Sequence, residues 1–367
     1  MLRSKYTFTQ MPTLNSPSDY QEARKWLISF LSKDKDVVSI YEYGTVKDPG
    51  ISDLDIMVVL KDRPDRKDFS GLLTVDNVPE RFSFLLNNDY KFISKEHFRE
   101  IDVFGKFRTK LLHGELIKRN QIPQRYARLY EIASVMDFMP ERILSILEVK
   151  MSKKILVIYV LGLLNSYLYT VKSVETIIGK KTSEMLDFEI ELKDLRNTWF
   201  QHDPDLRLNK ISSLMERSVV LGFKVIAELT FYLISKKYYQ PMQCVEGSRF
   251  FINQNKGYCF FFNGNDISAE KCFCPNEQKG IFILVPSIWL SHYYIYSKCN
   301  GRISKTISNN LILKGGPDEE SVGPVMAKVL SKRINLCNEM AEYFENYEIP
   351  LNRLHRFAHI KRISVNN

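Results

Sequence analysis

The sequence predicts an α+β chain with a small mixed sheet, a helical bundle after it, and a smaller C-terminal α+β region. Short β-prone runs mix with helical patterns in the first third of the chain, whereas helical patterns alone follow one another from about residue 124 to residue 239. After Pro241, aromatic-rich β-prone runs alternate with Asn, Gly and Pro. We therefore predict three domains, over residues 1–120, 121–240 and 241–367.

Length and composition are those of a globular protein. The chain has 367 residues, more than one typical domain contains, and 44% of them are hydrophobic while 26% are charged. This composition excludes an intrinsically disordered chain. The net charge of +9 favours polyanionic partners such as nucleotides or nucleic acid.

The sequence also predicts a cytoplasmic location and no membrane partner. The polar stretch from Met1 to Pro17 lacks the apolar core of a signal peptide. The longest apolar run, Ile155 to Leu164, is shorter than the ~20 residues that a bilayer-spanning helix needs. Six cysteines are scattered over the last third without zinc-like spacing, which indicates reduced thiols.

The first domain is predicted to begin with a helix and to continue with three strands. The helix is expected over Ser18–Ser32, with Ser18 as its cap and Gln21 as the capping-box partner. Two weakly patterned stretches, Phe69–Leu73 and Val78–Leu86, are expected to be helical. The period-two runs predict strands over Val37–Tyr43, Ile56–Leu60 and Tyr90–Ser94, the last leading into a helix at Ser94.

A change in the hydrophobic periodicity of the sequence predicts the bundle and the C-terminal region. We expect helices over 124–138, 141–178, 183–201 and 208–237, with a break at Met139-Pro140. The C-terminal region is predicted to contain a long helix over about Glu319–Tyr347, after strands over Phe250–Asn253, Tyr258–Asn263, Gly280–Val285 and Trp289–Tyr296.

The chemistry of the chain is expected around two carboxylates, Asp53 and Asp55. They are separated by one residue at the start of an apolar strand, so both side chains point to the same face. Burying two like charges together is costly unless a cation neutralises them. Carboxylates are ligands that Mg²⁺ prefers, and the pair therefore predicts a magnesium site.

A glycine turn precedes this pair. Gly44 lets the backbone approach a phosphate without an intervening Cβ, and the Thr45 hydroxyl can donate to phosphate oxygens. Ser52 is placed either to contact a phosphate or to cap the turn before the strand. The turn and the carboxylates together predict a site for a metal-bound nucleotide.

The order of glycine turn, loop and acid-x-acid strand resembles the signature of the nucleotidyltransferase superfamily with the DNA polymerase β-like palm. The resemblance covers Tyr41 to Asp65, and a helical bundle behind the palm also occurs in the aminoglycoside-type members. It implies Mg²⁺-dependent transfer of a nucleoside monophosphate from an NTP such as ATP to a hydroxyl of a small molecule, a protein or an RNA end. It also implies two metal ions, or one plus the nucleotide.

Within that resemblance, Asp53 and Asp55 are the catalytic and metal-binding residues, and Gly44, Thr45 and Ser52 bind the nucleotide. The family carries a third carboxylate on a later strand, and Lys91 occupies the best-matching position here. The third carboxylate and the general base are therefore unassigned.

Two other functions stay open. Arg196-Asn197 followed by His202 resembles the ribonuclease signature of the HEPN helical-bundle families, in which Arg and His act on a scissile RNA phosphate. The remaining alternative is a catalytically silent nucleotide-binding module.

Overall fold

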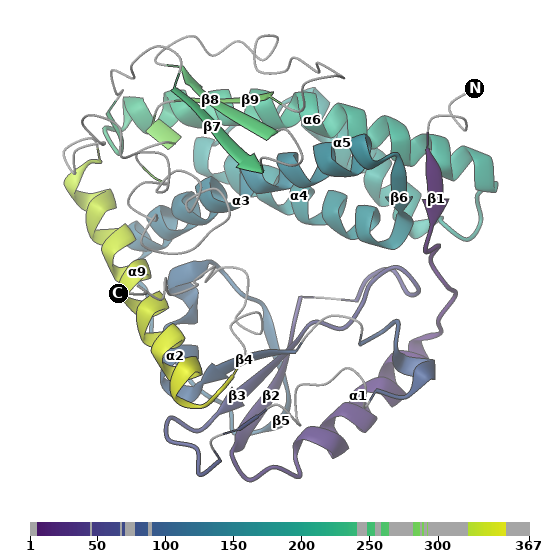
Figure 1. The fold of residues 1–367 in the computed structure, drawn as a ribbon, viewed down its shortest axis with the longest axis vertical. Coiled ribbons are helices and arrows are strands. Elements are labelled where there is room, and N and C mark those ends of the chain that lie inside the picture. The colour runs from purple at the N-terminus through teal and green to yellow at the C-terminus, as the bar shows by residue number, and fades with distance from the viewer. Residues whose placement is uncertain are drawn as a thin grey trace. The chain divides into compact units, whose positions relative to one another are not determined.

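The structure is a computed structural model, and its fold is α+β, with a small mixed sheet early in the chain and a helical region after it (Figure 1). It describes residues 6–44, 46–66, 68–69, 78–86, 90–240, 248–253, 258–263, 282–286, 288–289, 292 and 322–349. The predicted fold class is therefore confirmed.

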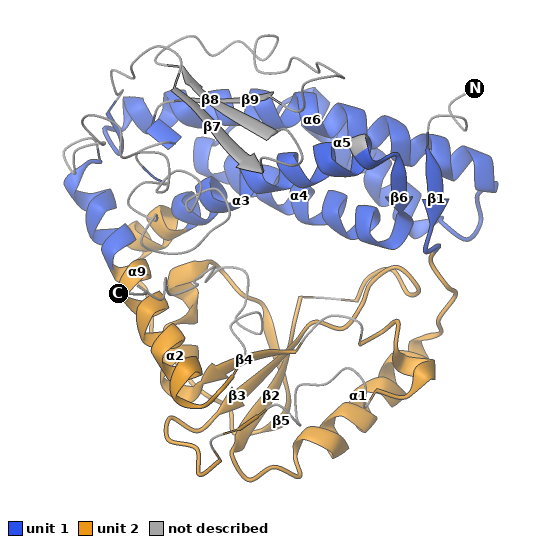
Figure 2. Cartoon of the chain, in the orientation of Figure 1, with its two compact units in different colours: residues 1–11, 131–331 blue, residues 12–130, 332–367 orange. Residues whose placement is uncertain are grey.

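The chain divides into two compact units, which Figure 2 shows in different colours. The helical unit comprises residues 1–11 and 131–331, and the sheet unit comprises residues 12–130 and 332–367. Two helices, α3 (Gln124–Ser152) and α9 (Pro324–Asn346), run from one unit into the other. Each compact unit combines segments that are distant in the sequence. The division into three consecutive domains therefore stays a prediction.

The sheet unit is built on four strands in the order β4-β3-β2-β5. The central strands β2 and β3 are antiparallel, β4 is parallel to β3, and β5 is antiparallel to β2. The bounds of the strands are β2 Val37–Tyr43, β3 Ile56–Leu60, β4 Lys91–Ser94 and β5 Thr109–Gly114. The predicted strands at β2 and β3 are confirmed, and the third begins one residue later than predicted.

Helices cover both faces of this sheet (Figure 1). On one face, Arg24 of α1 (Pro17–Leu31) forms a bidentate ion pair with Glu42 of β2. On the other face, Tyr41 of β2 stacks on Phe98 of α2 (Lys95–Arg99), with ring centroids 4.6 Å apart. Adjacent residues of a strand point to opposite faces, so these two contacts identify which helix covers which face. All five residues of β3 are buried as a result.

Helix α1 begins before the predicted residue. Its cap is Ser16, not Ser18, and its capping-box partner is Asp19, not Gln21. The Ser16 backbone N–H donates to Asp19 Oδ2 at 2.7 Å, and the Asp19 N–H donates to Ser16 Oγ at 3.3 Å. Pro17 is compatible with this start because the first helical residue needs no N–H partner.

The predicted helix over Val78–Leu86 is wrong. This stretch forms only a short 3-10 turn, η4 (Glu80–Phe82), and the described part of Phe69–Leu73 is Phe69 alone. The helix start at Ser94 is confirmed, since Ser94 Oγ accepts the His97 N–H at 3.2 Å. Strand β5 was not predicted, because it lies at the edge of the sheet and its six residues are half-buried or exposed without a clear alternation.

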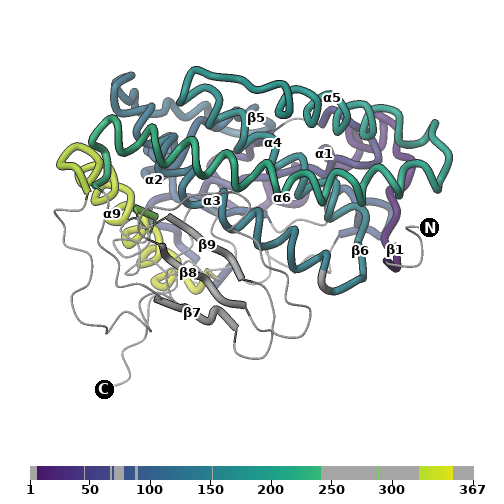
Figure 3. The backbone as a smooth tube through the Cα atoms, turned by 90° about the horizontal axis from the view of Figure 1, so that it is seen from above, coloured from purple at the N-terminus to yellow at the C-terminus, as the bar shows by residue number. Residues whose placement is uncertain are grey.

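The helical unit is a bundle of long helices. Helix α3 continues through Pro140, so the predicted break there is wrong. The chain breaks instead at Lys153, whose φ of +54° ends the helix. Helices α4 (Val157–Ile178), α5 (Ser183–Asn197) and α6 (Pro204–Ser235) follow and lie side by side (Figures 1 and 3).

Two small sheets complete the helical unit. Strands β1 (Thr7–Thr9) and β6 (Lys154–Leu156) pair in parallel and were not predicted. Strands β7 (Ser248–Asn253), β8 (Tyr258–Asn263) and β9 (Phe282–Pro286) form a mixed sheet at three of the four predicted positions. The fourth prediction is wrong at its described residues, because Trp289 and His292 are helical.

The last helix, α9, begins at Pro324 and not near Glu319. Val322 forms a β-bridge with Tyr239, so the helix starts only after this residue. Its C-terminal half belongs to the sheet unit. There the buried Arg333 donates to the carbonyls of Val103 and Tyr130, each at 3.2 Å.

Among the described helices, α4 and α6 are long and apolar enough to cross a membrane by length and composition. In each, about half of the apolar window, 50% and 56%, is buried inside the structure. Core helices of soluble proteins pass the same test, so this is weak support for a membrane span. The cytoplasmic location stays a prediction.

Candidate functional site

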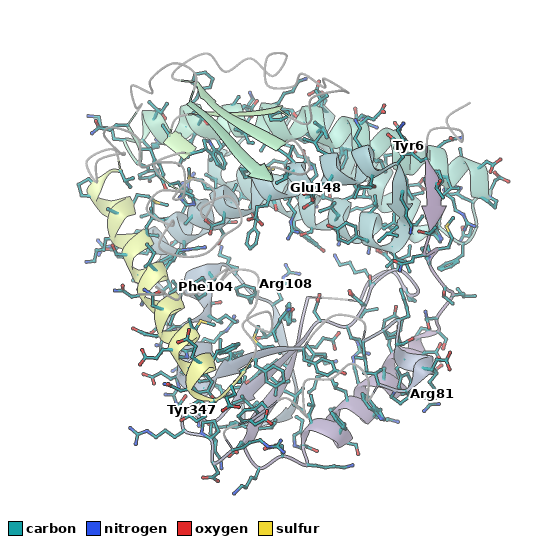
Figure 4. The ribbon with its side chains drawn as sticks, in the orientation of Figure 1. Tyr6, Arg81, Phe104, Arg108, Glu148 and Tyr347 are labelled. Atoms are coloured by element: carbon teal, nitrogen blue, oxygen red, sulfur yellow. The ribbon has the colours of Figure 1, made fainter. Side chains whose placement is uncertain are left out.

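The predicted turn and carboxylates meet at one end of the sheet. Strand β2 ends there, while β3 and β5 begin there. The Tyr43 N–H donates to the Asp55 carbonyl at 3.0 Å, and the Gly44 N–H donates to the Arg108 carbonyl at 3.1 Å. Gly44 therefore lies between the starts of the two strands that flank β2. Arg108 is labelled in Figure 4.

Gly44 lies directly against the Asp55 carboxylate. Its φ is +84°, a left-handed conformation that favours glycine. A Cβ built on Gly44 would be 3.3 Å from Asp55 Oδ2, which is tighter than nine in ten real Cβ contacts. Glycine is therefore favoured at this turn both by its backbone conformation and by the close approach of the Asp55 carboxylate.

Asp53 and Asp55 differ in burial from their neighbours, and their shared face stays a prediction. Both are half-buried, whereas Leu54 and Ile56 beside them are buried. The Leu54 N–H donates to the Leu85 carbonyl at 2.8 Å, and this hydrogen bond also holds the segment that carries the two aspartates in place. Residues two apart in extended chain are about 6.6 Å from each other, so two carboxylates on one face can reach a common cation.

Tyr20 of α1 holds the loop that leads to the carboxylates. Its hydroxyl accepts the Gly50 N–H at 2.9 Å and donates to the Ser52 carbonyl at 2.5 Å. Burial raises the pKa of Tyr20, and the nearby Asp53 charge raises it further. The phenol therefore stays neutral and remains able to donate. Sequence patterns gave no signal for this role, which depends on the packing of α1.

The structure bears on the two roles predicted for Ser52. The Asp48 N–H points to Ser52 Oγ at 3.4 Å, and the Ser52 N–H donates to the Asp48 carbonyl at 2.9 Å. These contacts close the turn before the strand and support the capping role. Thr45, the predicted phosphate donor, lies outside the described residues.

No protein-family model, no curated protein and no solved structure matches the chain. The assignment of the site therefore rests on its own residues and geometry.

The described residues at the expected third position include no carboxylate. Lys91 begins β4 and pairs with Met57, two residues after Asp55, so a cation occupies the strand beside the acid pair. Glu42 pairs with Ile56, which places it on the α1 face, opposite to the face of Met57 and Asp55. Arg24 already binds it there, with Nε 2.7 Å from Glu42 Oε2.

Asp102 is engaged elsewhere in the sheet unit. Arg119 Nη1 donates to Asp102 Oδ1 at 2.7 Å, although burial still raises the pKa of Asp102. Within the described residues, no three His, Cys, Asp or Glu side chains gather closely enough to hold a metal ion. A cation at this site would therefore be held by the Asp53 and Asp55 carboxylates and complete its shell with phosphate oxygens and water, as Mg²⁺ commonly does.

The predicted ribonuclease residues have structural roles in the helical unit. Arg196 is 6% exposed, and its Nη1 donates to the Leu161 carbonyl of α4 at 3.0 Å. His202 Nε2 is 2.7 Å from Thr198 Oγ1 and 3.6 Å from Asp194 Oδ2. A guanidinium buried between two helices is not placed to orient an RNA phosphate at the surface.

Proposed function

We propose that this protein is a Mg²⁺-dependent nucleotidyltransferase that moves a nucleoside monophosphate from an NTP to a hydroxyl acceptor. One observation carries the proposal: the left-handed Gly44 turn lies directly against the Asp55 carboxylate, with no Cβ between them, at one end of a mixed sheet. A glycine turn beside a carboxylate suits a phosphate that is bridged to that carboxylate by a cation.

Each residue of the site has a separable role in this proposal. Asp53 and Asp55 hold the cation, which, when bound, neutralises charge on the phosphate oxygens. Gly44 contributes by the absence of a Cβ, because its N–H is already bonded to the Arg108 carbonyl. The exposed Arg108 guanidinium is an additional phosphate partner at the same end of the sheet, which the sequence pattern did not indicate.

The position of Lys91 favours a second candidate function, nucleotide binding without transfer. A lysine next to the acid pair can bind phosphate but cannot serve as the third carboxylate of the resembled family. The two functions differ in one measurable product, because only transfer releases pyrophosphate.

Calorimetric titration with Mg·ATP tests the binding that both functions require. The variant Asp53→Asn/Asp55→Asn is expected to lose binding, because the amides cannot balance the charge of the cation. Asp187→Asn, an exposed aspartate of α5 in the helical unit, is the control for loss of a surface carboxylate and should bind as the wild type does. Unchanged binding by the double variant would remove the proposed site.

Transfer is tested separately. Purified protein is incubated with each labelled NTP, Mg²⁺ and a cell extract, and the labelled acceptor and the released pyrophosphate are measured. Label in an acceptor that depends on Asp53 and Asp55 supports the transferase. Binding of Mg·ATP with no pyrophosphate from any NTP supports the silent module instead.

A further inference from the structure

Asp53 is held through its backbone on both sides. The peptide before it carries the Ser52 carbonyl, which accepts the Tyr20 hydroxyl at 2.5 Å. The peptide after it carries the Leu54 N–H, which donates to the Leu85 carbonyl at 2.8 Å. Each peptide is planar, so these two hydrogen bonds constrain the direction in which the Asp53 side chain leaves the backbone. One partner is a backbone carbonyl, and the other is the side chain of Tyr20.

Tyr20 also holds the loop before the acid pair at a second point. Its hydroxyl accepts the Gly50 N–H at 2.9 Å. The Ser52 N–H donates to the Asp48 carbonyl at 2.9 Å, which closes residues 48–52 into a turn. Tyr20 is 2% exposed, so water does not compete for the two bonds of its hydroxyl. The phenol therefore fastens a closed turn to helix α1.

Helix α1 in turn fixes Tyr20 relative to the sheet. Arg24 follows Tyr20 by four residues and lies on the same face of α1, where it forms hydrogen bonds of 2.7 and 2.8 Å with Glu42 of β2. Asp55 is attached to β2 directly, because the Tyr43 N–H donates to its carbonyl at 3.0 Å. One aspartate is thus held by the strand pairing, and the other is held from α1 through Tyr20.

We propose that Tyr20 is a positioning residue for the metal site, because its hydroxyl sets the place of Asp53 relative to Asp55. The effect on metal binding rests on the function proposed above. Mg²⁺ demands near-ideal octahedral geometry with oxygens at about 2.0–2.1 Å, so a small shift of one carboxylate weakens binding although the charge of the site is unchanged. Replacing a residue that orients a metal ligand typically costs about 10–100-fold in metal affinity.

Tyr20→Phe tests this role, because it removes the hydroxyl and keeps the ring. Calorimetric titration with Mg·ATP should show binding at least ~10-fold weaker than that of the wild type. The matched control is Tyr41→Phe. Tyr41 is also 2% exposed, and its hydroxyl likewise accepts a backbone N–H, that of Ile117 at 2.9 Å, and donates to a backbone carbonyl, that of Glu115 at 3.2 Å. This control should also lose stability but should bind Mg·ATP within about twofold of the wild type.

Electron paramagnetic resonance of bound Mn²⁺ separates a change of position from a loss of stability. Mn²⁺ takes the same carboxylate and water ligands as Mg²⁺, and its spectrum depends on the arrangement of those ligands. With Mn²⁺ and ATP, the bound-ion spectrum of Tyr20→Phe should differ from that of the wild type, whereas that of Tyr41→Phe should match it. Destabilisation alone changes the amount of bound ion and not its spectrum. Circular dichroism at the same temperature checks that both variants are folded.

The outcomes distinguish this inference from the proposed function. A binding defect in Tyr20→Phe that Tyr41→Phe lacks, together with an altered Mn²⁺ spectrum, supports the positioning role. Wild-type binding by Tyr20→Phe, equal losses in the two variants, or an unaltered spectrum would overturn it and leave the transferase proposal in place. If the wild type does not bind Mg·ATP, the proposed function fails and the positioning role falls with it.

Discussion

Gly44→Ala tests the contact on which the proposed nucleotide site depends. The substitution adds one Cβ at a residue with φ of +84°, 3.3 Å from Asp55 Oδ2. It introduces no charge and removes no hydrogen-bonding group, since the Gly44 N–H to the Arg108 carbonyl is retained. The expected effects are a modest loss of stability and a larger loss of Mg·ATP binding.

The magnitude follows from two opposing effects on the backbone. A left-handed conformation costs an L-residue roughly 1–2 kcal/mol relative to glycine. Alanine also lowers the entropy of the unfolded chain, which offsets about 0.4–1 kcal/mol. The net loss is on the order of 1 kcal/mol, or a fall of about 2–4 °C in Tm. The new methyl also displaces the Asp55 carboxylate by a few tenths of an ångström, so binding should weaken at least ~10-fold, about 1.4 kcal/mol.

Gly179→Ala is the matched control. Gly179 has φ of +77° at the end of α4, and a Cβ there would meet nothing within 4 Å. Its backbone cost should therefore equal that of Gly44→Ala, but it should leave Mg·ATP binding unchanged. Both variants are measured by thermal unfolding and by calorimetric titration with Mg·ATP.

One result would refute the reasoning. If Gly44→Ala loses the same stability as Gly179→Ala yet binds Mg·ATP like the wild type, no phosphate occupies the space beside Asp55. The glycine would then be required for the turn alone.

Three further predictions concern the packing around the site and the bundle. Tyr20→Phe leaves the Gly50 N–H and the Ser52 carbonyl without their buried partner, so thermal unfolding should show a loss of about 2 kcal/mol, and an unchanged Tm would contradict the anchoring role. Burial opposes ionisation of Glu189, but Lys172, Lys193 and Lys181 at 2.5, 2.5 and 3.0 Å outweigh it and lower its pKa to about 2. A lowered carboxyl pKa stabilises the fold above its usual value of 4.5, and this contribution is lost as pH falls toward 2. Glu189→Gln should thus cost roughly 1–3 kcal/mol in urea unfolding at pH 7 and almost nothing near pH 2, and a pH-independent difference would argue against the ion cluster. His202→Ala removes only its contacts with Thr198, Asp194 and Lys210, so any metal-independent RNA cleavage by the protein should persist, and loss of that cleavage would revive the ribonuclease hypothesis.

The fold class and the central strands could be predicted because their signals are local. The β-prone run of β2 and the apolar run of β3 each form a strand at the predicted residues, and all of β3 is buried. The same local alternation predicts Asp53 and Asp55 on one face, and their half-burial beside the buried Leu54 and Ile56 fits that prediction. Pro140 misled the prediction, because the rest of α3 continues the helix on both sides of it.

The rest of the candidate site depends on contacts between distant segments. Tyr20 reaches the loop before the carboxylates from another element, and Arg119 reaches a carbonyl twelve residues away. The edge strand β5 and the grouping of the end of α9 with the sheet unit are likewise fixed by pairing and packing. No local periodicity encodes such partners.

The sequence by itself determined the fold class, the two central strands β2 and β3, and the place of a glycine before the two aspartates. Only the tertiary structure decided that Gly44 lies against Asp55, that Glu42 faces away, and that Arg196 is buried. The physical reason is that period and propensity specify which way a side chain points from its own backbone. Which partner it meets there is decided by the free energy of packing the whole unit.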